Sequence, residues 1–145
     1  MTEKQAVDAI LQAWQDGWEA LHPDDPEDPD YVPYTFNNET FETVATWVRV
    51  TIVPMVSNQA SLGAVRRWAR TGEIAVQIFA RPNEGLGTIA ILADDVRTVL
   101  EGQSIHTAGV DEPVCTYAGS SGSPSNDGAW QQLLVRVPYR YDHHH

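Results

Sequence analysis

The sequence predicts an α+β fold, a mainly antiparallel β-sheet with two amphipathic helices packed on one face. Apolar residues recur at helical spacing over residues 2–21 and again over residues 88–101. After each of these stretches comes a pair of segments rich in β-branched and aromatic residues. The order is therefore helix, strand pair, helix, strand pair. Turn residues inside each pair favour hairpins, and hence antiparallel pairing.

The first helix is expected over residues 2–21. Thr2 and Gln5 have the spacing of a capping box. Two tryptophans, Trp14 and Trp18, lie on its apolar stripe, and such a pair can form a shelf for a ligand. Because large aromatic side chains on a helical stripe are far more often core residues, we expect both to be buried.

Residues 22–38 are expected to form a loop, because HPDDPEDPD alternates proline with carboxylates and a helix interior does not tolerate this. The density of acidic residues suggests calcium, but the segment lacks the EF-hand pattern and its prolines space the ligands badly. We expect a solvated loop without a metal, and a short strand near Tyr34. The acidic residues of the loop are Asp24, Asp25, Glu27, Asp28 and Asp30.

The central element is a long hairpin over residues 46–82. Its strands are expected at residues 47–54 and 73–80, where alternating apolar residues predict one well-buried face. Pro54 is expected to end regular pairing or to mark a sheet edge. A turn is expected at three consecutive polar residues, Ser57, Asn58 and Gln59.

A basic patch follows this turn, in a chain whose formal net charge is −11. At strand spacing Arg66, Trp68 and Arg70 share one face, and Arg67 lies between them. One interpretation is an exposed arm with snorkelling arginines. The other is an assembly interface, because Trp and Arg are enriched at binding hot spots. Such an arm can pair head to tail with an acidic surface of an identical neighbour, and the acidic loop is the candidate counter-surface.

The second helix is expected over residues 88–101, with Gly102 in the position of a C′ glycine. Residues 85–90, GLGTIA, fit the loose dinucleotide fingerprint G-x-G-x-x-[GA]. The match is weak, because residues 81–84 separate it from the strand, Glu84 carries the wrong charge, and no βαβ units follow. The alternative is a strand-to-helix turn in which glycine takes a positive φ.

The second strand pair is expected at residues 113–118 and 130–141, with a further short strand near Ile105. Residues 119–128, GSSGSPSNDG, are all turn formers and predict a flexible hairpin loop. The final DHHH resembles the start of an expression tag. We therefore expect one domain over residues 1–141 and a tag remnant over residues 142–145.

The composition and the missing motifs argue against several functional classes. The acidic charge argues against general nucleic-acid binding, and no apolar run is long enough to span a membrane. We expect no signal peptide, and the single cysteine excludes an internal disulfide. Cys115 and His106 could meet in space, but nothing in the sequence places a base beside a nucleophile. We expect no catalytic residues, no metal and no cofactor.

Three segments of the chain resemble the tail terminator, or tail completion, proteins of long-tailed bacteriophages. The first is residues 34–41 leading into WVRVTIVP, and the second is GEIAVQIF at residues 72–79 with the helix that follows. The third is WQQLLVRVPYRY at residues 130–141. With the N-terminal helix they cover nearly the whole chain. The resemblance implies a subunit of a hexameric ring that caps the tail tube, stops its polymerisation and joins it to the head–tail connector.

The resemblance also implies a location and a set of partners. The protein would be made in the host cytoplasm and lie in the virion at the head-proximal end of the tail, without catalysis or cofactor. It would bind itself, the tail tube protein and the head–tail connector protein, but no membrane. It would bind no sequence-specific nucleic acid, and DNA would only pass through the ring lumen. The acidic loop departs from the family pattern.

Two other functions remain as alternatives. A head–tail connector or a tail-tube component would share the plan of sheet plus helices. A small-molecule or nucleotide-binding module would use residues 85–90, and it predicts saturable nucleotide binding.

Overall fold

The computed structural model describes residues 1–25, 27–36, 46–59, 61–63, 66–80, 85–107, 109–110, 112–126 and 130–144. These residues form two helices and seven strands, in an α+β fold whose sheet is mostly antiparallel, as the sequence predicts. Neither helix in this described part is long and apolar enough to cross a membrane. In chain order the elements are α1 (Glu3–Leu21), β1 (Tyr34–Phe36), β2 (Trp47–Gln59), β3 (Arg67–Ala80), α2 (Gly85–Leu100), β4 (Ser104–Ile105), β5 (Val114–Thr116), β6 (Ser121–Asn126) and β7 (Gln131–His144).

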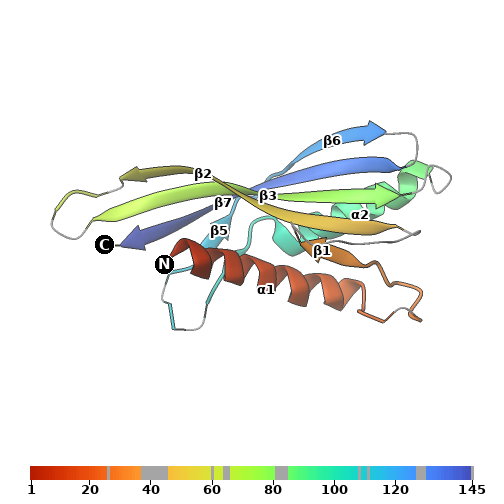
Figure 1. Cartoon of the computed structure of the whole chain (residues 1–145), viewed down its shortest axis with the longest axis horizontal. Helices are drawn as coiled ribbons and strands as arrows, with labels where there is room; N and C mark the ends of the chain where they lie inside the picture. Colours follow the sequence, from red (N-terminus) through yellow and green to blue (C-terminus); the bar gives the residue numbers. More distant parts are fainter. Residues whose placement is uncertain are drawn as a thin grey trace.

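Three long strands form the centre of the sheet. Its strand order is β1-β2-β3-β7-β5-β4, and β6 also pairs with β7 (Figure 1). β3 pairs along its whole length with β7 and along most of its length with β2, antiparallel in both cases. The short strand expected near Tyr34 is present as β1, but it pairs parallel to β2, at residues 48–50. The sheet is therefore antiparallel except at this edge.

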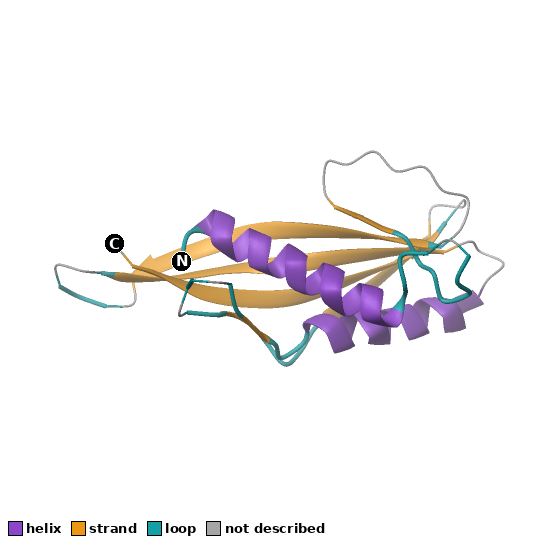
Figure 2. Cartoon of the chain, turned by 90° about the horizontal axis from the view of Figure 1, so that it is seen from below, coloured by secondary structure: helices purple, strands orange, loops and turns teal. Residues whose placement is uncertain are grey.

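The core lies between the helices and the sheet. Figure 2 shows both helices in front of the strands, on the same side of the sheet. Trp14 and Trp18 are fully buried and stack with their ring centroids 4.8 Å apart, which confirms the expectation that both are core residues. They pack in one cluster with strand residues such as Val48 and Val76. The capping box between Thr2 and Gln5 is also confirmed.

The hairpin is longer than the sequence predicts. β2 continues through the expected turn at residues 57–59, which pair with Arg70, Ala69 and Trp68 of β3. The turn prediction is wrong because backbone hydrogen bonds to β3 outweigh the local preference of these polar residues for turns. Pairing does not end at Pro54, but it is irregular there, since the register shifts between Pro54 and Val56.

The C-terminal segments also differ from the prediction. Residues 121–126, expected within a flexible loop, form strand β6 and pair with residues 131–136 of β7. This edge of β7 offers unpaired backbone groups, which the serine-rich segment satisfies despite its low strand propensity. β7 continues through residues 142–144, paired with β3, and His143 Nδ1 lies 2.6 Å from the carbonyl oxygen of Met1. The identification of residues 142–145 as a tag remnant stays a prediction.

The second helix begins three residues earlier than expected. Gly85 and Gly87 lie inside α2, and Gly87 has no positive φ. The interpretation of residues 85–87 as a glycine turn is therefore wrong, because these residues form the first turn of α2. At the other end of α2, Gly102 has φ 65° and confirms the expected C′ glycine. The strands expected near residues 105 and 113–118 are present as β4 and β5.

Candidate assembly surface

The three long strands extend beyond the helices. In Figure 1, β2, β3 and β7 run past the N-terminal end of α1. We call this extension the arm, and define it as residues 54–59 of β2, 67–72 of β3 and 139–144 of β7, which pair continuously apart from the bulge at Pro54. The arm contains Arg67, Trp68 and Arg70 of the basic patch that the sequence indicates, and Arg66 directly precedes β3.

The strand register divides the basic patch between two faces of the arm. Trp68 and Arg70 share one face, because side chains two residues apart point to the same side of a strand. Arg67 lies on the opposite face, where its Nε is 3.9 Å from the Asp142 carboxylate. Arg66 precedes the strand and its Nε donates to the Gly63 carbonyl at 3.4 Å. The four predicted interface residues are therefore neighbours at one end of the molecule but do not form one flat surface.

The face with Arg70 contains a hollow of about 320 Å³ next to the first turn of α1. Tyr139 and Tyr141 lie in it with their rings nearly parallel, 6.4 Å between centroids. We call this hollow the arm groove. Its lining residues are Glu3, Pro54, Met55, Val56, Ser57, Arg70, Thr71, Tyr139 and Tyr141.

The position of Tyr139 in the groove depends on Gly72. A Cβ atom at residue 72 would lie 2.5 Å from the Tyr139 hydroxyl and 2.6 Å from the Val53 carbonyl oxygen, so only glycine fits between them. Burial, together with the nearby Tyr141 and Glu3, raises the pKa of Tyr139 to about 12. The Tyr139 hydroxyl therefore stays neutral at physiological pH.

Arg70 differs from the other two arginines of the patch in having no partner. Among the described residues, no carboxylate or carbonyl oxygen lies within hydrogen-bond or ion-pair distance of its guanidinium. Its side chain is partly buried and lines the arm groove. A partly desolvated cation without a counter-ion is a favourable contact point for an anionic group of another molecule.

Hydrogen bonds hold the described residues of the acidic loop on both sides of position 26. The Asp25 carboxylate accepts from the Glu27 backbone N–H at 3.0 Å, and the Asp28 carboxylate accepts from the Asp30 N–H at 2.8 Å. Such Asx turns fix short segments rich in Asp. Asp24, Asp25, Glu27 and Asp30 remain exposed, and Asp28 is partly buried. Within the described residues, no group of three or more His, Cys, Asp or Glu is arranged to hold a metal ion.

His22 anchors this loop to the helices. Its Nδ1 lies 2.7 Å from the Asp30 carbonyl oxygen, and its Nε2 lies 2.8 Å from the Asp95 carboxylate of α2. The imidazole also packs on Trp18, 4.4 Å between ring centroids. No local sequence pattern indicates this contact, because His22 and Asp95 are 73 residues apart.

The arm and the acidic loop lie at opposite ends of the molecule. Figure 1 places the arm beyond the N-terminus of α1 and the loop after its C-terminus, along the longest axis. Positive charge therefore gathers at one end and exposed carboxylates at the other. This arrangement is complementary between two copies placed head to tail.

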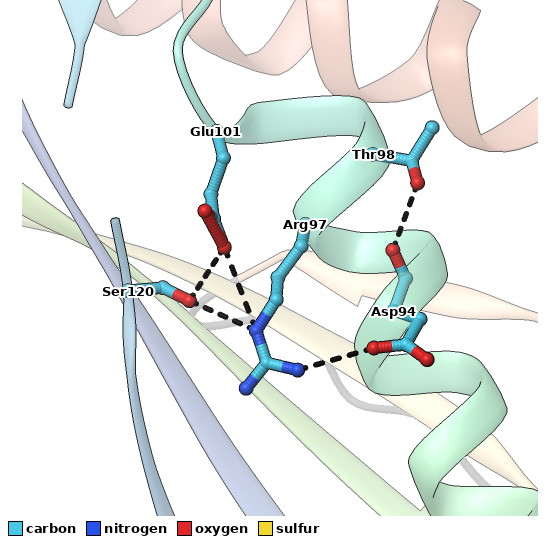
Figure 3. A network of polar contacts seen from close by, with 5 residues as sticks. All are labelled: Asp94, Arg97, Thr98, Glu101 and Ser120. Atoms are coloured by element: carbon cyan, nitrogen blue, oxygen red, sulfur yellow. Dashed lines mark hydrogen bonds and ion pairs between the residues drawn. The ribbon is translucent and has the colours of Figure 1, made fainter. Parts of the chain in front are cut away.

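A second polar cluster joins α2 to the segment before β6. Arg97 reaches the Asp94 carboxylate at 3.3 Å, the Glu101 carboxylate at 3.5 Å and the Ser120 hydroxyl at 3.0 Å (Figure 3). Ser120 in turn donates to Glu101 at 2.8 Å. Because these groups satisfy one another, we assign the cluster a structural role in fixing the start of β6.

The features behind the alternative functions lie apart from the arm. Cys115 is exposed on β5, where its strand partners are Ser104 and Arg140, and no hydrogen bond in the described residues joins it to His106. The start of α2 borders a hollow of about 500 Å³ with neutral lining. The lining residues are Ile89, Ala90, Pro124, Ser125, Gln131, Gln132 and Leu133. None of the described residues in this lining is Lys or Arg, which is unfavourable for a pyrophosphate.

Comparisons with known proteins give likeness in structure only. No family model matches the chain, and no curated protein matches it in sequence. One similar solved structure, of a protein whose name describes no function, has a TM-score of 0.73 at 14% identity and covers 97% of this chain and 96% of that one. Another is a chain of the virion of a native gene transfer agent particle, with a TM-score of 0.61 at 12% identity, covering 94% and 93%. At these identities the likeness shows a shared fold.

Proposed function

We propose that this chain is a structural virion protein of a bacteriophage or phage-like particle, and that its specific role is that of a tail terminator. The observation that carries the proposal is the likeness to a chain of the gene transfer agent virion, which extends over 94% of this chain. The described parts of the three segments that resemble tail terminators lie in β1 to β3, α2 and β7, so they include the long central strands of the sheet. The role is structural, not enzymatic.

In this role six copies form a ring at the head-proximal end of the tail. The ring caps the tail tube, stops its polymerisation and binds the head–tail connector, while DNA passes through the lumen. Head-to-tail contacts generate closed rings when the rotation between subunits permits. An elongated subunit with opposite charges at its two ends suits such contacts (Figure 1).

The assembly contacts are assigned to the arm and the acidic loop. Arg66, Arg67, Trp68 and Arg70 supply the basic and aromatic side. Their counter-surface is the acidic loop of the neighbouring copy, through Asp24, Asp25, Glu27, Asp28 and Asp30. Arg and Trp are the residue types that contribute most at interfaces, and the arm presents them beyond the covered body of the sheet.

The second candidate is a head–tail connector or a tail-tube component. It is favoured by the same structural likeness, because the related chain is described as part of a virion without a stated position in it. Tail length separates the two functions. A virus deprived of a terminator should make tubes of unregulated length, whereas loss of a connector should leave tubes of normal length unattached to heads.

The test is complementation of a virus from which this gene has been deleted. We expect overlong tubes without the gene, and normal tails when the unaltered chain is supplied. The Arg67→Glu/Arg70→Glu variant should fail to restore tails although it folds. Tubes of normal length in the deletion would contradict the terminator role, and normal virions with the charge-reversed variant would contradict the interface.

A further inference from the structure

We infer that the arm groove binds the acidic loop of a second copy of this chain, with residues 23–25 and 27–30 contacting Arg70, Met55 and Val56. This inference deepens the proposed function, since it rests on head-to-tail assembly and names the contact that would make it. It adds the tyrosine-lined groove to the four arm residues that sequence alone indicates.

The groove has the chemistry to bind a segment in which carboxylates alternate with prolines. Arg70 supplies a partly buried cation that no described carboxylate neutralises. Guanidinium–carboxylate hydrogen bonds are among the strongest contacts that proteins use for recognition. The exposed side chains of Met55 and Val56, which also line the groove, supply the apolar surface against which proline rings can pack, whereas Tyr139 and Tyr141 are buried. The acidic loop, with sequence PDDPEDPD, offers both partners within eight residues.

Part of the loop is preorganised in the free chain. Two Asx turns and the His22 contact to the Asp30 carbonyl hold described residues on both sides of position 26, which lowers the conformational entropy that binding costs. Asp24 is exposed, and none of its atoms makes a hydrogen bond with the described residues. Its carboxylate is therefore free to reach a cation on another molecule.

The charges around the groove also define how the loop approaches. Glu3 lines the groove on the α1 side, where its carboxylate repels another acidic group. Arg70 and Ser57 are opposite each other on β3 and β2 in the strand register. The acidic loop therefore contacts the groove on the Arg70 and Ser57 side. Because groove and loop lie at opposite ends of one chain, one copy cannot fill its own groove, and docking extends from copy to copy (Figure 1).

Disulfide trapping tests this contact directly. Ser57→Cys places a thiol at the groove and Asp24→Cys places one on the loop, in a Cys115→Ser background that removes the exposed native thiol. Under mild oxidation at high protein concentration, we expect a ladder of covalent dimers, trimers and larger species on a non-reducing gel. Each single-cysteine variant can form dimers only. A double-cysteine chain that stays monomeric would overturn the inference.

Three controls separate docking from random collision. Ser57→Cys combined with Ser123→Cys, an exposed position on β6, should give no ladder. Adding Arg70→Glu to the trapping variant should slow ladder formation at least tenfold, whereas Arg136→Glu, an equal charge change at an exposed site, should leave the rate unchanged. Docking in the groove would be contradicted if the ladder formed equally well with Ser123→Cys, or if Arg70→Glu left its rate of formation unchanged.

The trapping result is independent of the virus. If the protein forms a ladder but does not regulate tail length, the docking contact is supported and the terminator function is contradicted. If the protein caps tail tubes but forms no ladder, the terminator function is supported and the docking contact is contradicted.

Discussion

The body of the sheet and the arm are built from the same three strands but differ in what covers them. In the body, β2, β3 and β7 lie under two helices, and residues such as Val48, Val76 and Val135 are fully buried. In the arm the same strands run past the first turn of α1, and β2 has only exposed residues from position 53 to 59. The base of the arm, at Tyr139 and Tyr141, is still buried. The change occurs at Pro54, where the bulge interrupts the β2–β3 register. The body therefore contributes most of the stability, and the arm is the part that we propose for binding.

The largest expected effect comes from the core of the body. Trp14→Ala should lower the free energy of unfolding by about 3–5 kcal/mol, because it removes a fully buried aromatic side chain and leaves a cavity. Leu62→Ala, at the end of the arm with 91% of the side chain exposed, should change it by less than about 0.5 kcal/mol. Urea denaturation measures both. A loss below about 1 kcal/mol for Trp14→Ala would show that the body is not the stabilising region.

The junction between body and arm should be the next most sensitive site. Gly72→Ala places a methyl group against the Val53 carbonyl and the Tyr139 hydroxyl, and should cost about 1–3 kcal/mol. Gly87→Ala is the matched control, because a Cβ there meets open space inside α2 and should stabilise the helix by up to about 1 kcal/mol. Thermal unfolding of the two variants should therefore shift in opposite directions. Equal shifts would mean that Tyr139 does not pack across the sheet as described.

A smaller effect is expected in alkaline solution. The pKa of Tyr139 is raised from 10.0 to about 12 in the folded chain, so folding favours the neutral phenol. Its contribution to stability is complete below pH 10 and is lost as the pH rises from 10 towards 12, by up to about 1.4 kcal/mol per pH unit. Tyr139→Phe removes the titration, and its stability should fall less steeply over this range. Urea denaturation at several pH values measures the slopes, and identical slopes would contradict the burial of this hydroxyl.

The smallest effect on stability is expected in the arm itself. Arg67→Glu/Arg70→Glu removes one long ion pair, from Arg67 to Asp142, and should lower the free energy of unfolding by less than about 1 kcal/mol. The same variant should abolish assembly. Calorimetry and tail counting on the same preparation would measure both. A large loss of stability would show that the arm belongs to the folded core.

The sequence predicts the body better than the arm. The helices, the buried tryptophans, the capping box and the disruption at Pro54 follow from local patterns, because periodicity and capping act within a few residues. β6 and the extension of β2 could not be predicted in this way, since polar segments became strands only by pairing with distant β7 and β3. The arm groove was missed for the same reason. It needs Arg70 and Tyr141 side by side, and only the strand register places them there.

The most direct test of the terminator function is negative-stain electron microscopy of the purified chain mixed with growing tubes of the tail tube protein from the same virus. The account predicts rings bound at one end of each tube, and tubes that stop growing once they are capped. Bare tube ends, with growth unchanged by the added protein, would contradict it.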